Sequence, residues 1–169
     1  MAFTTFALAC LAGLKMRTMM LDTNCFYAAN IERLTRKLPR GFLERSRILT
    51  VNGDAGPEKA ASALLTREDT KAILVDDLNS LNALIGRADR NSSGHKFFVL
   101  MRLLSYNARV HNIALLASVY KNQRLNRNSR RSLAASTDLQ INVETKASYI
   151  TFRCESIGAW PDKGFTVSL

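Results

Sequence analysis

The chain has 169 residues, a length typical of one domain, and its 47% hydrophobic and 22% charged residues are those of an ordinary globular protein. Its 24 Lys and Arg against 14 Asp and Glu give a formal net charge of +10. An excess of this size favours a polyanionic partner, most often nucleic acid, and a merely basic surface is the alternative. Cys10, Cys25 and Cys154 form no C-x-x-C pair, which disfavours zinc and disulfide frameworks and favours a cytoplasmic protein.

The first part of the chain alternates between helical and strand patterns. Phe3–Leu14 is apolar but too short to span a bilayer, so it is expected to be a core helix, and no membrane partner is expected. The patterns predict helices over Thr4–Leu14 and Tyr27–Leu38, and strands over Thr18–Asp22 and Arg47–Val51.

The middle of the chain continues this alternation. The patterns predict a turn over Asn52–Pro57, helices over Glu58–Leu65, Leu78–Gly86 and His95–His111, a surface loop over Arg87–Gly94, and strands over Ala72–Val75 and Ile113–Val119. In the longest helix, the three- and four-residue steps between Phe98, Met101, Leu104 and Ala108 predict the face that meets the core.

The last part of the chain consists of short β-branched runs. Strands are expected over Asp138–Val143, Tyr149–Arg153 and Phe165–Val167, as an antiparallel edge added to the parallel sheet. The order of the elements predicts an α/β fold with a doubly wound, mainly parallel sheet and C-terminal antiparallel strands, in a single domain over residues 1–169.

Acidic residues close two of the predicted strands. Asp22 ends the first, and Asp76 and Asp77 follow the buried run Ala72–Val75. Ligands of doubly wound sheets bind at the carboxyl ends of the strands. Neighbouring residues of one strand point to opposite faces, so only one of Asp76 and Asp77 can face a given site, which weakens a two-carboxylate metal site. No metal site is expected.

Five segments resemble, in the same order and at similar spacing, the ATPase core of the RecA superfamily, and the pattern is most similar to archaeal RadA and its paralogs. They resemble the helix after the phosphate loop (K-T-T-L-A), the strand Y-I-D-T-E with its later P-E-R-L, the Walker B strand, the strand that ends T-N-Q, and the strand entry after the second DNA-binding loop. In this chain they are Thr4-Thr-Phe-Ala-Leu-Ala9, Met20-Leu-Asp-Thr23 with Ile31-Glu-Arg-Leu34, Ile73-Leu-Val-Asp-Asp77, Val119-Tyr-Lys-Asn-Gln123 and Ser132-Leu-Ala-Ala-Ser-Thr-Asp138. The resemblance covers nearly the whole chain and implies a RecA-like P-loop NTPase core.

The departures from this family concern ATP hydrolysis. The signature G-x-x-x-x-G-K-[ST] is absent, Phe3 stands where the family has Lys, and Asn24 stands where the family has the acid that positions the attacking water. The resemblance therefore implies a pseudo-ATPase with a vestigial nucleotide site and no catalytic residue. That site consists of Thr4, Thr5, Asp76 and Gln123. No cofactor is expected, and ATP with magnesium would bind weakly.

Two alternatives to a pseudo-ATPase stay open. A phosphate loop could precede Met1, although Asn24 lies well inside the chain and argues against that explanation alone. A neighbouring subunit could also supply the loop to an active nucleotide enzyme.

A dense basic run follows the last parallel strand and matches the family's second DNA-binding loop. Its members are Lys121, Arg124, Arg127, Arg130 and Arg131. The resemblance implies that they bind DNA, single-stranded in the first instance, through its phosphates; a solvated basic turn is the alternative.

The resemblance implies a protein that binds DNA, a RecA/RadA-type recombinase, or both, and that assists homologous recombination and DNA repair. The alternative is a RecA-fold regulatory or scaffold subunit that binds protein partners and not DNA. The N-terminal helical domain and polymerisation linker of full recombinases find no match in the chain, so filament assembly by that route is not expected, and a homodimer stays open.

Overall fold

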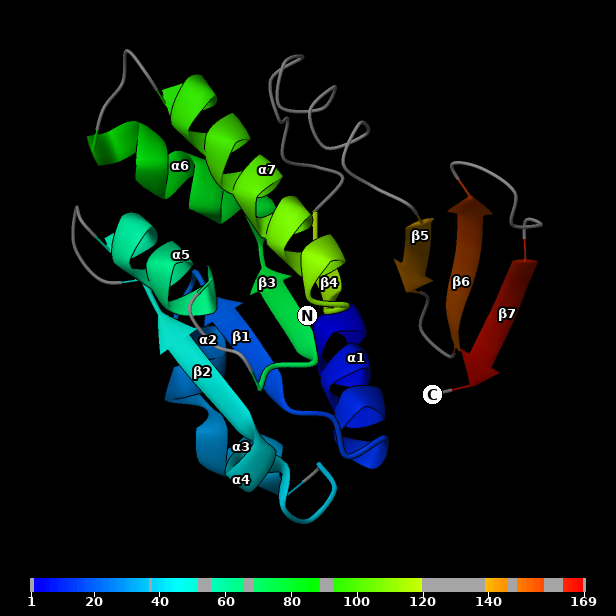
Figure 1. Cartoon of the computed structure of the whole chain (residues 1–169). Coiled ribbons are helices and arrows are strands. Elements are labelled where there is room, and N and C mark those ends of the chain that lie inside the picture. Colours follow the sequence, from blue (N-terminus) through cyan, green and yellow to red (C-terminus); the bar gives the residue numbers. More distant parts are fainter. Residues whose placement is uncertain are drawn as a thin grey trace. The chain divides into compact units, whose positions relative to one another are not determined.

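The computed structural model of the chain describes residues 2–36, 38–51, 56–65, 69–88, 93–119, 139–145, 149–156 and 163–168 (Figure 1). The chain divides into two compact units, Met1–Arg130 and Arg131–Leu169, and each unit is described by itself. The expectation of a single domain over residues 1–169 stays a prediction.

The larger unit is an α/β structure around a parallel sheet. Four strands form this sheet in the order β2-β1-β3-β4, and every neighbouring pair is parallel. The strands are β1 (Thr18–Asp22), β2 (Ser46–Thr50), β3 (Ala72–Asp76) and β4 (Ala114–Ala117). The helices are α1 (Ala2–Gly13), α2 (Phe26–Ala29), α3 (Ile31–Thr35), α4 (Phe42–Arg45), α5 (Gly56–Leu65), α6 (Leu78–Ala88) and α7 (Ser93–Val110). The predicted α/β class with a mainly parallel sheet is confirmed.

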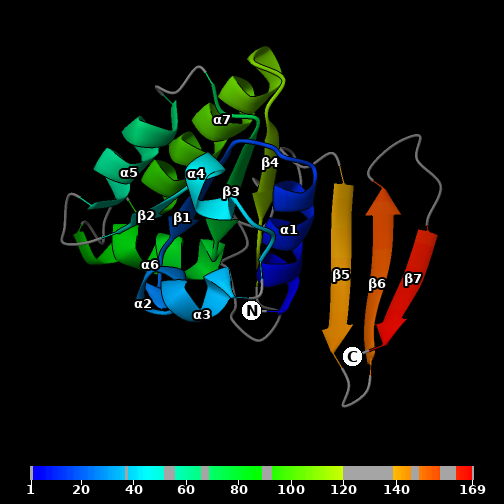
Figure 2. The same cartoon turned by 90° about the horizontal axis from the view of Figure 1, so that it is seen from below.

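The core lies on both faces of the two central strands. Every residue of β1 and β3 is buried, as expected for parallel strands that are covered on both sides. On one face, Met20 of β1 and Leu74 of β3 pack in a cluster with Leu8 of α1 and Tyr27 of α2. Figures 1 and 2 show α5 and α7 on one side of the sheet and α2 and α3 on the other.

The predicted helix over Tyr27–Leu38 is wrong, because the chain breaks at Asn30 into the short helices α2 and α3. The Asn30 side chain donates a hydrogen bond to the Phe26 carbonyl oxygen over 2.8 Å. The Asn30 N–H also donates to this oxygen over 3.1 Å, and the helix ends because the Asn30 backbone, at φ −112° and ψ 22°, leaves the helical conformation. The helix α4 was not predicted, and it begins directly after Gly41, whose φ of 76° is left-handed and costs glycine no steric strain.

Other elements agree with the sequence patterns except at their ends. The helix α5 begins at Gly56 rather than Glu58. Both ends of the predicted loop Arg87–Gly94 are helical, because α6 extends to Ala88 and α7 begins at Ser93. The buried face of α7 contains Met101, Leu104 and Ala108 as predicted, but it contains Phe97 in place of Phe98, which is 36% exposed. None of the described helices is long and apolar enough to cross a bilayer.

The smaller unit is a three-stranded antiparallel sheet. Its strands are β5 (Leu139–Thr145), β6 (Tyr149–Ser156) and β7 (Lys163–Ser168), in the order β5-β6-β7. In its register Val143 lies opposite Phe152, and Phe152 lies opposite Phe165. The C-terminal antiparallel strands are therefore confirmed, but they form a sheet of their own, where an added edge of the parallel sheet was expected.

Candidate functional site

Three buried acids lie at the carboxyl edge of the parallel sheet. Asp22 at the end of β1 and Asp76 at the end of β3 are register partners, and Asp77 follows Asp76 directly. All three are at most 3% exposed. A buried carboxylate is costly unless it is hydrogen-bonded, so the donors around each acid indicate what that acid does.

The Asp22 carboxylate holds the start of α2. Its oxygens accept hydrogen bonds from the backbone N–H groups of Phe26 (3.1 Å), Tyr27 (2.8 Å) and Ala28 (2.9 Å). These groups are the unpaired donors of the first turn of a helix, which side-chain oxygens commonly satisfy. We infer that Asp22 has a structural role.

The Asp77 carboxylate holds the start of α6 in the same way. It accepts hydrogen bonds from the Ser80 backbone N–H over 2.7 Å and from the Ser80 hydroxyl over 3.1 Å. The Asn24 side-chain amide also donates to it, over 3.1 Å. Asn24, at the position where the family resemblance places a catalytic acid, is thus bound to a carboxylate that caps a helix.

The Asp76 carboxylate joins segments that are far apart in the sequence. Its Oδ1 accepts a hydrogen bond from the Thr4 hydroxyl over 2.9 Å, across a separation of 72 residues, and another from the Ser118 hydroxyl. Thr4 lies in the first turn of α1, and Ser118 follows β4. Within the described part of the chain, no donor reaches the second oxygen, Oδ2.

The backbone around Asp76 is also held in place. The Asp76 carbonyl oxygen accepts hydrogen bonds from the Thr23 backbone N–H (2.9 Å) and from the Thr23 hydroxyl (2.7 Å). The Ser118 N–H donates to the Val75 carbonyl oxygen, and the Leu78 N–H donates to the Ser118 carbonyl oxygen, each over 3.0 Å. The ends of β1, β3 and β4 are therefore fixed to one another beyond the last ladder bond of each strand.

The Tyr27 phenol belongs to the same cluster of side chains as Asp76 and Thr4, because it is hydrogen-bonded to the Thr5 and Thr4 hydroxyls. Tyr27 is completely buried, and burial raises the pKa of its phenol above the ordinary value of 10.0. The negative charges of Asp76 and Asp22 also raise this pKa, and hydrogen bonds with the Thr5 and Thr4 hydroxyls act in the opposite direction. The phenol therefore stays protonated beside the carboxylates.

The structure brings together some of the residues that the sequence singled out. Thr4 and Asp76 are in direct contact, and Thr5 meets the neighbouring Tyr27. Gln123 and the basic run, Lys121, Arg124, Arg127, Arg130 and Arg131, lie outside the described residues, so their assignments stay predictions. The described residues contain no group of three or more His, Cys, Asp or Glu side chains that could hold a metal ion.

Two members of the cluster were missed. Ser118 directly follows a buried strand, and this position at the carboxyl edge of a sheet could have identified it. Tyr27 gave no such signal, because its sequence pattern indicates only a residue of a helix. Chemically, the cluster presents a hydroxyl and a carboxylate oxygen side by side, and oxygen ligands of this kind suit hard cations such as Mg²⁺.

Comparisons with known proteins add no family to these observations. No protein-family model matches the chain, and no curated protein matches it.

The raised pKa of Tyr27 predicts a specific pH dependence of stability. The folded state holds the phenolic proton more tightly than the unfolded state, so the free energy of unfolding falls as the pH rises from about 10 toward the raised pKa. Tyr27→Phe removes this contribution. Urea unfolding at about pH 8, about pH 10 and about pH 11 should show the wild-type protein losing stability relative to Tyr27→Phe only above about pH 10. A difference that does not change with pH would contradict the buried, protonated phenol.

Proposed function

We propose that this chain is an ATPase-deficient paralog of the RecA superfamily, of the archaeal RadA type, that binds DNA, a recombinase, or both, and assists homologous recombination and DNA repair. The observation that carries the proposal is the contact between the Thr4 hydroxyl and the Asp76 carboxylate. In P-loop NTPases, the Ser or Thr of the phosphate loop and the Walker B Asp hold the same magnesium ion. Thr4 and Asp76 match these two residues in the sequence resemblance.

The position of this contact also supports the proposal. Asp76 ends the central strand β3, and Thr4 lies in the first turn of α1, whose amino end is therefore at the carboxyl edge of the sheet (Figure 1). A helix that starts at this edge presents its free N–H groups where doubly wound folds bind phosphates. The arrangement is compatible with a RecA-like core as well as with other nucleotide-binding α/β folds.

The residues around the contact support a loss of hydrolysis. Asn24 has no carboxylate to orient an attacking water, and its amide is bound to Asp77. The sequence also contains no G-x-x-x-x-G-K-[ST] segment, whose lysine and backbone N–H groups would hold the β- and γ-phosphates. We infer that any ATP and magnesium that reach Asp76 bind weakly and without turnover.

The charge of the chain supports a nucleic-acid partner. A net charge of +10 on 169 residues favours association with a polyanion, and the basic run over Lys121–Arg131 concentrates five of these charges near the end of β4 in the sequence. Binding to phosphates of this kind does not depend on base sequence. The proposed binding is therefore electrostatic, salt-dependent and without sequence preference.

We expect the purified chain to show no ATP turnover above background. Asn24→Glu should not restore turnover, because an added carboxylate cannot replace the phosphate-binding lysine of the family, at whose position this chain has Phe3. Phosphate release is measured with magnesium present. Asp76→Ala is the matched control: turnover that persists in this variant comes from a contaminant, whereas turnover that disappears in it would overturn the ATPase-deficient assignment.

We also expect the chain to bind single-stranded DNA in a salt-dependent way. Replacing Arg124, Arg127 and Arg130 with Ala should weaken binding and lower the slope of log K against log salt by about 0.7 for each phosphate that the variant no longer neutralises. A variant with Ala at Arg33, Arg36 and Arg40 removes the same charge at another basic cluster of the sequence and should retain more affinity. Fluorescence anisotropy with labelled single- and double-stranded DNA measures both variants. Absence of binding at low salt would favour the regulatory or scaffold subunit that binds protein only.

A further inference from the structure

The helix α7 has two apolar faces on opposite sides. Its inner face contains Phe97, Met101, Leu104 and Ala108, each at most 5% exposed. Its outer face exposes four apolar or aromatic side chains, which we call the outer stripe: Val99 (39%), Leu103 (47%), Tyr106 (70%) and Val110 (54%). The stripe advances in steps of four, three and four residues, so its members lie in one row along the helix.

An apolar row in solvent is unusual for a helix that covers a sheet. Such helices normally carry one apolar face toward the core and polar or small residues on the opposite side. The neighbouring helix α6 follows this rule, because its exposed positions include the small Ala83 and the charged Arg87, while Leu81 and Ile85 are buried. The outer stripe therefore points to a second contact, since contiguous exposed apolar surface commonly marks an interaction site.

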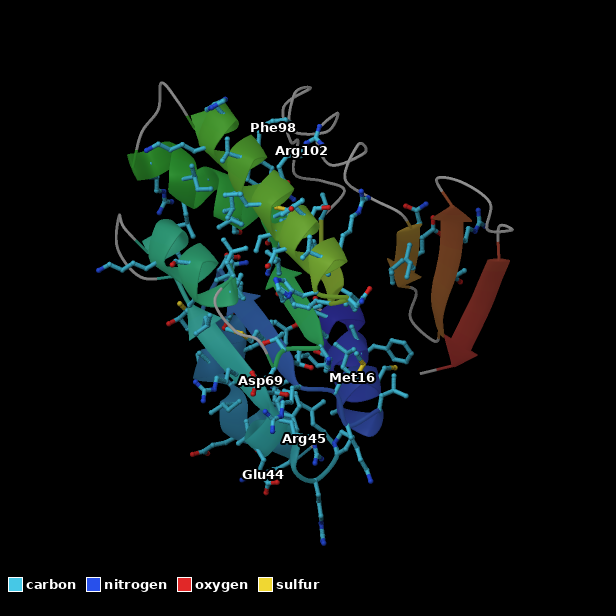
Figure 3. The ribbon with its side chains drawn as sticks, in the orientation of Figure 1. Met16, Glu44, Arg45, Asp69, Phe98 and Arg102 are labelled. Atoms are coloured by element: carbon cyan, nitrogen blue, oxygen red, sulfur yellow. The ribbon has the colours of Figure 1, made fainter. Side chains whose placement is uncertain are left out.

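The basic residues beside the outer stripe restrict the chemistry of a binding partner. Among its 18 residues, α7 has no acidic residue, and it carries exposed basic residues at Lys96, Arg102 and Arg109. The Arg102 guanidinium lies over the Phe98 ring, 5.3 Å from the ring centre, and Figure 3 shows these two side chains on α7. This stacking keeps a positive charge beside exposed apolar surface. A complementary partner would present an apolar row with acidic residues beside it.

We propose that the outer stripe of α7 docks an amphipathic helix of another protein, whose apolar residues repeat at heptad spacing and are flanked by Asp or Glu. The stripe has the alternating three- and four-residue spacing of the narrow apolar rows along which two helices pack. Charge pairing with Arg102 then orients the partner. This inference goes beyond the proposed function, because it involves neither the carboxyl edge of the sheet nor the basic run over Lys121–Arg131.

Two other occupants of the stripe fit the observations less well. A second copy of the chain would bring one α7 against another, and neither helix has an acidic residue that could face Arg102 of the other copy. A lipid surface usually takes a helix with a broad apolar face, whereas α7 buries one apolar face in the core and offers only a narrow row outward.

Two synthetic helical peptides test the proposal directly on the full chain. Each has about three heptads with Leu at positions a and d; one carries Glu at positions e and g, and the other carries Lys there. Fluorescence anisotropy at low salt should show the Glu peptide binding about tenfold or more tightly than the Lys peptide. Leu103→Ser should weaken binding of the Glu peptide about tenfold, and Leu103→Glu should abolish it.

The control variant is Ala83→Glu, which places the same charge at an exposed position of α6 and should leave peptide binding unchanged. Circular dichroism and urea unfolding establish that the variants fold, as expected for exposed positions. Three outcomes would overturn the proposal: equal or absent binding of the two peptides, a wild-type dimer that Leu103→Glu converts to a monomer, or binding to phosphatidylserine vesicles that Leu103→Glu removes. None of these outcomes affects the DNA and ATP measurements, because Leu103 has no part in the nucleotide or DNA proposal.

Discussion

The larger unit depends on a buried carboxylate at the tip of its central strand. Asp76 is 3% exposed, and its Oδ1 accepts hydrogen bonds from the hydroxyls of Thr4 and Ser118. Hydrogen bonds to a charged group are roughly twice as strong as neutral ones, and a buried charge without them is strongly unfavourable. Asp76 therefore fixes the start of α1 and the end of β4 against the end of β3. These contacts lie at the carboxyl edge of the sheet, where doubly wound folds bind ligands.

The three acids at this edge differ in whether all their carboxylate oxygens are hydrogen-bonded within the fold. The Asp22 and Asp77 carboxylates accept hydrogen bonds from groups at the starts of α2 and α6, and Asp77 also holds Asn24. Both are used by the fold. Asp76 uses its Oδ1 to accept a hydrogen bond from the Thr4 hydroxyl. No donor within the described residues reaches its other oxygen, Oδ2. This difference is why the proposed nucleotide site centres on Asp76 with Thr4, and not on Asp22 or Asp77.

The sequence predicted best the elements whose residues are buried on both sides. The strands β1 and β3 are continuous apolar runs that end in acids, because parallel strands in the middle of a sheet meet helices on both faces. The break at Asn30 was not predictable from periodicity, since a single residue leaves the helical conformation inside an otherwise continuous apolar pattern. In α7 a one-residue error placed Phe98 in the core instead of Phe97, because apolar residues occupy both faces of that helix.

The candidate site was predictable only in part, because its residues come from segments that are far apart in the sequence. The family resemblance singled out Thr4 and Asp76 separately, and the structure brings them together. Ser118 and Tyr27 join the same cluster through tertiary contacts that no local pattern encodes. The outer stripe of α7 was also missed, because a search for one core-facing row assigns the remaining apolar residues no role.

The most direct test of the role of Asp76 compares two chemically identical substitutions. Thr4→Val removes a hydroxyl that donates to the buried Asp76 carboxylate, whereas Thr35→Val removes one that donates to the Glu32 carbonyl oxygen in an exposed contact. Urea unfolding at neutral pH should show a loss of roughly 1.5–3 kcal/mol for Thr4→Val and within about 0.5 kcal/mol of no change for Thr35→Val. Equal, small effects of the two substitutions would show that Asp76 does not hold the edge of the sheet together.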